Sequence, residues 1–185
     1  NYKEKRLIFT TDLKKAVLNS DIIFICVGTP TLKNSDSADL KYVFNVVKQL
    51  KKLISRYKII VTKSTVPVCT GDKIENILSN LTNKNLVDVV SNPEFLREGE
   101  AIRDFIHPDR VIIGTNSKKA NKIMNALYAP IVKKTSRYYN TSRRGAELIK
   151  YASNAFLATK ITYINELANL CEKTGVDIKD ISAGM

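Results

Sequence analysis

The stretch DIIFICVGTPT, residues 21–31, decides the fold of this chain. Residues 21–27 are an almost continuous apolar run, which is typical of a β-strand covered by helices on both faces. The run breaks at Gly28-Thr29-Pro30, a combination typical of a turn. The stretch therefore predicts a buried strand of a parallel sheet, followed by a loop at its carboxyl end.

The flanking segments alternate between strand and helix patterns. Apolar residues repeat at helical spacing over residues 40–53, and Lys58–Thr62 predicts a second buried strand. The same patterns predict strands over 7–10, 86–90 and 110–114 and helices over 13–18, 71–81 and 117–128, with Thr11 or Asp12 capping the first helix. Repeated β-α-β alternation with short connections indicates a doubly wound α/β fold with a parallel sheet.

A long helical pattern follows Tyr139. From Arg143 to Lys173 there is no proline, the apolar residues keep helical spacing, and Gly175 is a natural stop. A helix of roughly 30 residues far exceeds the usual length of about 11 or 12. Such a helix is typical of a link between domains or of a subunit interface.

Composition excludes several classes of function. The formal charge is +12, but 22 Lys against 8 Arg are scattered along the chain, so we expect attraction for small anions and no nucleic-acid binding. No apolar run approaches the roughly 20 residues that span a bilayer. Three cysteines without a CxxC pair and a lone His107 indicate neither a disulfide framework nor a metal site. We expect a reduced, cytoplasmic protein.

Polar residues follow three predicted strands, and the carboxyl ends of strands are where open α/β sheets bind ligands. Thr29 follows the first strand and Thr65 the second. After the third, the segment SNPEFLREGE (91–100) predicts a helix that begins at Pro93, with Glu94 and Glu98 one turn apart. Each signal is weak by itself, because such threonines are common in turns and an acid in a first helical turn complements the helix dipole.

Lys150 and Asn154 lie four residues apart in the long helix and therefore share one face. Their neighbours on that face are Ala and Phe. One interpretation is a snorkelling lysine beside an exposed asparagine. The other is a pair of donors that stabilises negative charge on a substrate oxygen.

Four motifs in this order resemble the nucleotide-sugar dehydrogenases, and in particular the UDP-glucose 6-dehydrogenases. They are VGTP, KSTVP, SNPEFLREGEAIRDF with PDRVIIG, and GAELIKYASNAFLATKITYINELANLCEKTGVDI, and together they extend over essentially the whole chain. The resemblance implies the second half of a Rossmann-type NAD-binding sheet over residues 1–139. It also implies an incomplete central domain over 140–185, whose long helix forms a homodimer.

The resemblance also implies a reaction and its residues. Members of this family oxidise the C6 alcohol of UDP-glucose to the carboxylate with two NAD in succession, through a cysteine-bound intermediate. The implied NAD contacts are Thr29, Thr65 and Glu98. The implied sugar-nucleotide site comprises Glu94, Phe95, Leu96, Arg97, Glu98, Lys150 and Asn154. Within it, Glu94 is the expected base for the hydrolytic water, and Lys150 and Asn154 the expected oxyanion donors.

Two parts of the family pattern are absent from these 185 residues, the G-x-G-x-x-G turn and the cysteine loop that carries the nucleophile. Cys26 is expected inside a buried strand and Cys171 on an apolar helix face, and Cys69 takes a position where the family usually has glycine. We therefore expect the central part of a longer enzyme, inactive by itself. The alternatives are a sibling dehydrogenase for GDP-mannose or a UDP-N-acetylhexosamine, a non-catalytic remnant of a split gene, and a plain nucleotide-binding module.

Overall fold

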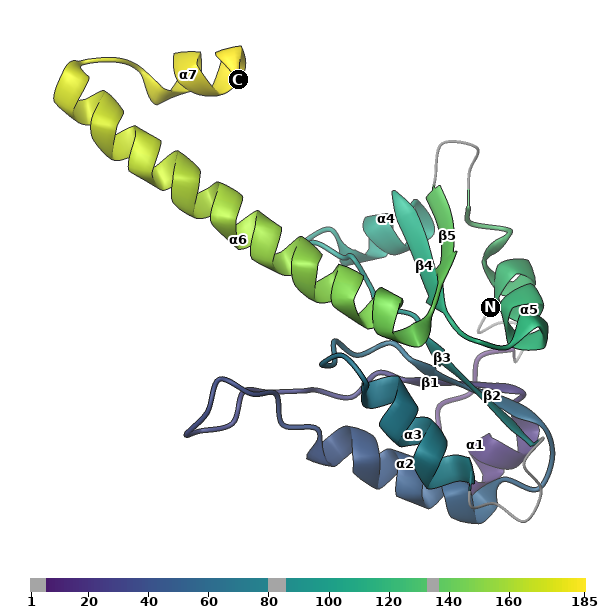
Figure 1. The fold of residues 1–185 in the computed structure, drawn as a ribbon. Helices are drawn as coiled ribbons and strands as arrows, with labels where there is room; N and C mark the ends of the chain where they lie inside the picture. The colour runs from purple at the N-terminus through teal and green to yellow at the C-terminus, as the bar shows by residue number, and fades with distance from the viewer. Residues whose placement is uncertain (1–5, 80–85, 133–136) are drawn as a thin grey trace. The chain divides into compact units, whose positions relative to one another are not determined.

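The computed structural model describes residues 6–79, 86–132 and 137–185, and the chain forms two compact units, 1–148 and 149–185 (Figure 1). The first unit contains a five-stranded sheet with helices on both faces. The second contains most of the long helix α6 and the short helix α7. No helix in the described ranges is long and apolar enough to cross a membrane.

The sheet has the spatial order β1-β2-β3-β4-β5, which is also the order along the chain. Pairing is parallel between β1 and β2, between β2 and β3, and between β4 and β5. The strands are β1 (Ile22–Ile25), β2 (Lys58–Thr62), β3 (Val87–Ser91), β4 (Arg110–Gly114) and β5 (Arg137–Thr141). The sheet is therefore mostly parallel, as the sequence predicted.

One strand pair departs from the parallel arrangement. β3 and β4 are antiparallel and joined by the single pair Ser91 and Gly114. A parallel return requires a crossover helix packed on the sheet, but the only helix of this connection, α4 (Ala101–Ile106), buries none of its residues. The chain therefore turns back beside β3 without crossing the face of the sheet.

Five helices agree closely with the predicted patterns: α1 (Leu13–Asn19), α2 (Lys41–Leu53), α3 (Thr70–Ser79), α5 (Lys118–Tyr128) and α6 (Arg143–Thr174). The short helices α4 and α7 (Ile178–Gly184) were not predicted with these bounds. Asp12 caps α1 by accepting from the backbone N–H of Lys15, and Ser117 caps α5 by accepting from Ala120. Gly175 adopts φ +71° after α6, the left-handed conformation that ends helices. Residues 80 and 81 of the predicted 71–81 helix lie outside the described residues.

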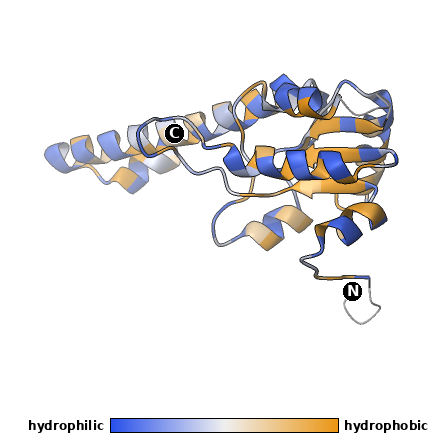
Figure 2. Cartoon of the chain, turned by 90° about the horizontal axis from the view of Figure 1, so that it is seen from below, coloured by the Kyte–Doolittle hydropathy of each residue, from blue (hydrophilic) through white to orange (hydrophobic). Residues whose placement is uncertain are grey.

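Alternate residues of β2 face two separate cores, which explains its uninterrupted apolar sequence. Ile60 packs in a cluster with residues of α2 and α3, including Val47 and Ile74. Ile59 and Val61 pack in a second cluster with α5 residues, including Met124. Figure 2 shows the strands as mainly hydrophobic and the outer helices as banded. Both faces of the sheet are thus covered.

Two strand assignments differ from the sequence prediction. The run Leu7–Thr10 is not a strand: its residues are exposed, and it pairs with no strand in the described part of the chain. In contrast, β5 was not predicted, because RYYNT lacks a continuous apolar run and no residue of it is fully buried. β5 forms as an edge strand alongside β4.

Candidate functional site

The loops that follow β1 and β2 are tied together at the carboxyl edge of the sheet. The hydroxyl of Thr29 donates to the backbone oxygen of Thr65 at 2.8 Å, and the hydroxyl of Ser64 donates to that of Val27 at 2.6 Å. Both threonines are partly exposed. Gly28, directly before Thr29, has no atom within 4 Å of where a Cβ would lie, so the backbone there is accessible. The two predicted cofactor threonines therefore share one open edge.

Beside this edge lies a polar cluster that the sequence reasoning missed. The amide oxygen of Asn92, which is buried, accepts from the hydroxyl of Tyr128 and lies 3.4 Å from the Nζ of Lys63. The Asn92 side-chain NH₂ donates to the backbone oxygen of Ile112 at 2.9 Å. Desolvation raises the pKa of Tyr128 to about 12, so the phenol stays protonated at neutral pH and acts as the donor. An Asn directly before Pro93, between two buried strands, was the available signal.

The predicted helix start at Pro93 is wrong. Residues 92–97 are irregular, and α4 begins only at Ala101, after a turn in which Gly99 has φ +82°. The backbone N–H of Asn92 donates to the oxygen of Thr62 at 2.9 Å, which continues the strand pairing and holds the chain extended. Glu94 and Glu98 are consequently not one helical turn apart. Glu94 is half-buried and Glu98 exposed.

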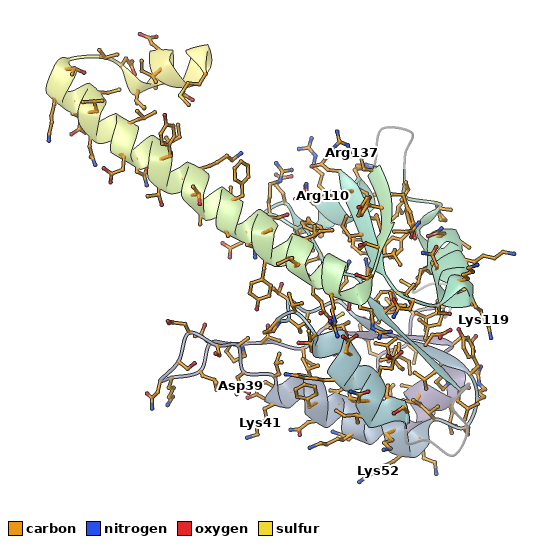
Figure 3. The ribbon with its side chains drawn as sticks, in the orientation of Figure 1. Asp39, Lys41, Lys52, Arg110, Lys119 and Arg137 are labelled. Carbon is orange, nitrogen blue, oxygen red and sulfur yellow. The ribbon has the colours of Figure 1, made fainter. Side chains whose placement is uncertain are left out.

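Two cationic contacts hold the rest of the PEFLRE segment. The guanidinium of Arg110, labelled in Figure 3, lies 4.2 Å from the centre of the Phe95 ring. Arg97 contacts the carboxylate of Asp104 through both its side chain, at 2.7 Å, and its backbone N–H, at 2.9 Å. These hydrogen bonds from Arg97 lower the pKa of Asp104 to about 2. Leu96 is exposed. Arg97 is therefore engaged by Asp104 in this structure.

Cys26 was expected inside a strand, and this prediction is wrong. β1 ends at Ile25, and Cys26 is exposed at the start of the loop. Nearby protein atoms raise the pKa of its thiol by desolvation, the charge of Lys63 lowers it, and that of Glu94 raises it further. Glu94 and Lys63 are thus within electrostatic reach of the same point at this edge. Cys171 is buried as expected.

The first turn of α6 carries a buried carboxylate that the sequence reasoning also missed. Glu147 is 3% exposed and accepts from the backbone N–H groups of Cys69 and Gly71, each at 2.8 Å, and from the Ser91 hydroxyl at 3.0 Å. Burial raises the pKa of Glu147, and the hydrogen bonds from Gly71, Ser91 and Cys69 oppose this shift. A carboxylate one turn before Lys150, flanked by Ala146 and Leu148, was the signal in the sequence.

Arg143 and two glycines let this turn approach the sheet closely. The buried guanidinium of Arg143 contacts Asp72 at 2.9 Å and Glu75 at 2.5 Å, both on α3. A Cβ on Gly71 would lie 2.9 Å from the Glu147 carboxylate, and a Cβ on Gly114 would lie 2.6 Å from that of Ala146. Side chains at either glycine would force the turn away from the strand ends.

Cys69, where the resemblance leads one to expect glycine, adopts φ +74°, the one positive φ of a non-glycine residue in the described ranges. A Cβ in the left-handed region is strained by roughly 1 kcal/mol or more. The hydrogen bond from its N–H to Glu147 holds the loop in this conformation. Cys69 is therefore a strained residue held in place by Glu147.

Lys150 and Asn154 lie on α6 in the second unit, four residues apart as predicted. Lys150 is 8% exposed, whereas Asn154 is exposed. A lysine this well buried is not a solvated surface residue, which weighs against the snorkelling interpretation for Lys150.

The arrangement defines a class of protein. A mostly parallel sheet with helices on both faces, whose hydroxyl-bearing loops gather at the carboxyl ends of β1 and β2, is a dinucleotide-binding α/β domain of the Rossmann type. Two solved dehydrogenases share this architecture. They are a GDP-mannose dehydrogenase from Pseudomonas aeruginosa (TM-score 0.91, 34% identity, 98% of this chain and 42% of that one) and a UDP-glucose dehydrogenase from Pyrobaculum islandicum (TM-score 0.89, 36% identity, 97% and 42%).

The chain belongs to the UDP-glucose/GDP-mannose dehydrogenase family. Residues 1–132 match the NAD binding domain of this family and residues 144–185 its central domain. Two similar relatives are UDP-glucose 6-dehydrogenase of Rhizobium meliloti, 48% identical over 100% of this chain and 43% of the relative, and YwqF of Bacillus subtilis, 46% identical over 100% and 41%. The chain thus spans about two fifths of the length of these relatives.

NAD is the cofactor of this domain, and the residues of the strand-end edge fit it. The accessible backbone at Gly28 and the partly exposed hydroxyls of Thr29 and Thr65 offer neutral hydrogen-bonding groups suited to a dinucleotide. The exposed apolar side chain of Val68 lies in the same loop as Thr65. These residues would hold the part of the cofactor that reaches the ends of β1 and β2.

Proposed function

We propose that the protein containing this chain oxidises the C6 alcohol of UDP-glucose to the carboxylate of UDP-glucuronate. The observation that carries the proposal is the hydrogen bond of Thr29 to Thr65, which gathers the two cofactor loops at the edge where Glu94 also lies. The names of the relatives support UDP-glucose as the substrate.

The proposed oxidation balances in atoms and in charge. One primary alcohol, one water and two NAD⁺ give one carboxylate, two NADH and three protons. NAD supplies the hydride acceptor for both oxidations. The residues of this chain bind, orient and move protons. Thr29, Thr65 and the exposed Glu98 contact the cofactor in this proposal.

Glu94 is the proposed base for the water that releases the product. It is half-buried, follows a strand end, and lies within electrostatic reach of the Cys26 thiol at the same edge. A carboxylate at such a place can accept a proton from water. Phe95, Leu96 and Arg97 are the proposed contacts of the sugar nucleotide. We infer that Arg97 leaves Asp104 when it binds the substrate.

Lys150 and Asn154 are the proposed donors to the substrate oxygen. Their spacing on α6 presents an ammonium and an amide on the same face. A fixed positive charge in a partly buried site stabilises an alkoxide or a tetrahedral oxyanion more strongly than water does. The burial of Lys150 supports this role.

A related sugar nucleotide is the second candidate substrate. The Pseudomonas aeruginosa neighbour with TM-score 0.91 is a GDP-mannose dehydrogenase, so the fold is compatible with another base and sugar. A UDP-N-acetylhexosamine is the third. The 185 residues alone, without the Gly-rich turn and the cysteine loop, are proposed to be inactive. A non-catalytic remnant remains the alternative of another class.

A homodimer through α6 is part of the proposal. Within the second unit the helix exposes large apolar side chains at Phe156, Leu157, Ile161, Tyr163 and Leu170. Apolar surface of this kind on a long helix suits an isologous contact with a second copy.

The test uses the full-length protein with UDP-glucose, GDP-mannose and UDP-N-acetylglucosamine, each with NAD, and follows NADH absorbance. We expect about two NADH per UDP-glucose consumed and little reduction with the other sugars. If only GDP-mannose is oxidised, it replaces UDP-glucose as the proposed substrate. If none of the three is oxidised, the result favours the non-catalytic remnant.

The role of Glu94 is tested by Glu94→Gln, with the exposed Glu100→Gln as the matched control. We expect the first to lower kcat by about 10²-fold or more, because a general base typically contributes 10²–10⁴-fold, and the control to leave it unchanged. Equal activity of both variants would remove Glu94 from the mechanism.

A further inference from the structure

Glu147 is a buried carboxylate with three neutral donors. One oxygen accepts from the Gly71 N–H at 2.8 Å and the Ser91 hydroxyl at 3.0 Å, and the other accepts from the Cys69 N–H at 2.8 Å. Burying a carboxylate is costly unless hydrogen bonds compensate for the lost water. The cost of burying the Glu147 carboxylate in α6 indicates that this residue has a specific structural role.

The three donors lie next to two loops of the candidate site. Cys69 and Gly71 lie shortly after the KSTVP motif that carries Thr65, with Gly71 in the first turn of α3, and Ser91 is the last residue of β3, three residues before Glu94. Their attachment to the sheet differs. Ser91 pairs with both Thr62 and Gly114, whereas Cys69 lies outside the strands in a strained conformation. Glu147 is therefore most important for the loop that carries Thr65.

The geometry points to Glu147 as a positioning residue that holds the Thr65 loop in the conformation that binds NAD. This inference rests on the proposed function for its reaction, but its first readout is NAD binding itself. Strained backbone persists only where its surroundings over-determine it, and two of the three hydrogen bonds to Glu147 act on this loop. Removing the carboxylate lets residues 65–71 relax and moves Thr65 away from the cofactor.

The sharpest variant is Glu147→Gln, which keeps size and shape. An amide has only one acceptor oxygen, so with that oxygen facing Gly71 and Ser91 its NH₂ faces the N–H of Cys69, donor against donor. The Ser91→Ala variant removes one donor from the sheet side and leaves both loop donors in place. Ile74→Val, on the buried face of α3, serves as a control that destabilises the fold without touching the carboxylate.

The experiment measures the dissociation constant of NAD by calorimetry and the KM for UDP-glucose at saturating NAD, in the full-length protein. We expect Glu147→Gln to weaken NAD binding about tenfold, as for a lost charge-assisted hydrogen bond, with the KM for UDP-glucose within about twofold. Ser91→Ala and Ile74→Val should stay within about twofold for NAD. A glutamine variant that binds NAD like the wild type, or an equal loss in Ile74→Val, overturns the inference.

A second measurement tests the inference if the Glu147→Gln variant does not fold. Amide hydrogen exchange of the wild-type protein should show Cys69 and Gly71 protected to an extent similar to the interior of α3. Fast exchange at both positions would overturn the inference. If the wild type binds NAD but oxidises none of the sugar nucleotides, the proposed function fails while the test of Glu147 remains readable.

Discussion

The helix α6 contains two regions of opposite character. Its first turn, residues 143–147, buries Arg143, Ala146 and Glu147 against α3 and the strand ends. Within the second unit, residues 156–163 of the same helix carry large apolar side chains that are exposed. Polar groups are thus buried at one end and apolar groups exposed further along.

This difference teaches that polarity alone does not decide burial in this helix. The charged side chains of the first turn are buried because each finds partners of matching chemistry: Arg143 has two carboxylates and Glu147 three donors. The apolar side chains further along have no such matched surface in the second unit. Buried charge therefore marks the fixed end of the helix, and exposed apolar area marks the end suited to a partner.

The largest loss of stability is expected from a side chain placed at Gly114, where the first turn of α6 lies close to β4. In Gly114→Val the new side chain would meet the Cβ of Ala146 at 2.6 Å and the oxygen of Ser142 at 2.7 Å. Overpacking of this kind costs about 3 kcal/mol, which urea unfolding would measure. Gly184→Ala, with open space around it, is the control and should change stability by less than about 0.5 kcal/mol. Equal effects would mean that the first turn is not fixed closely.

Removing the buried guanidinium should have the next largest effect. We expect Arg143→Met to lower the free energy of unfolding by about 2 kcal/mol, less than for a fully buried pair because Glu75 is half exposed. Arg144→Met is the matched control. Arg144 also contacts Asp72, at 2.6 Å, but is 65% exposed, so solvent screening should make its contribution much smaller than that of Arg143. If the control loses more than Arg143→Met, burial is not what distinguishes the first turn.

The contacts of Arg143 and Arg144 with Asp72 also predict that the stability of the fold depends on pH. Arg144, and then Arg143, hold the pKa of Asp72 below its usual value of 3.8. A depressed pKa contributes stability that is present above pH 3.8 and is lost as the pH falls through the folded value. Unfolding curves between pH 5 and 2 should therefore be less steep in pH for Arg144→Met than for the wild type. Parallel curves would contradict the assignment.

A smaller effect, in the opposite direction, is expected at the loop anchored by Glu147. Cys69→Gly relieves a residue at φ +74° and should raise stability by about 1 kcal/mol, measured by thermal unfolding. Cys26→Gly, exposed and without positive φ, should not stabilise. A loss of stability in Cys69→Gly would show that the thiol makes a compensating contact.

The smallest change in fold stability is expected at the exposed end. Phe156→Ser should alter the free energy of unfolding of the monomer by less than about 0.5 kcal/mol, because the ring is 65% exposed. In the full-length protein the same substitution should weaken self-association, read as a shift from dimer to monomer in sedimentation. An unchanged dimer would move the interface away from this face of α6.

Much of the fold could be predicted because its strands are buried on both faces. Continuous apolar runs such as Ile59–Val61 and the caps Asp12 and Ser117 have local sequence signatures. β5 had none, since an edge strand is defined by its partner β4. The antiparallel direction of β4 follows from a connection whose helix α4 does not pack on the sheet, which no local pattern in the sequence reveals.

The candidate site, like the fold, was predicted only in part. Thr29 and Thr65 come together because parallel strands place their ends at one edge. The helix expected at Pro93 did not form, because the distant partners Thr62 and Ile112 hold Asn92 extended. Glu147 was overlooked since its three donors lie 56 to 78 residues away in sequence. The apolar neighbours of Glu147 were a local signal of burial, but the identity of its distant donors has no local pattern.

The single residue pair between β3 and β4 has a consequence for the order in which the chain folds. The segments β1–β3 and β4–β5 are each parallel units built from neighbouring parts of the sequence, and only Ser91 and Gly114 join their ladders. A joint of one residue pair is only marginally stable by itself, so it forms after the ladders on both sides of it. Substitutions at Ser91 or Gly114 should then accelerate unfolding while leaving the refolding rate nearly unchanged.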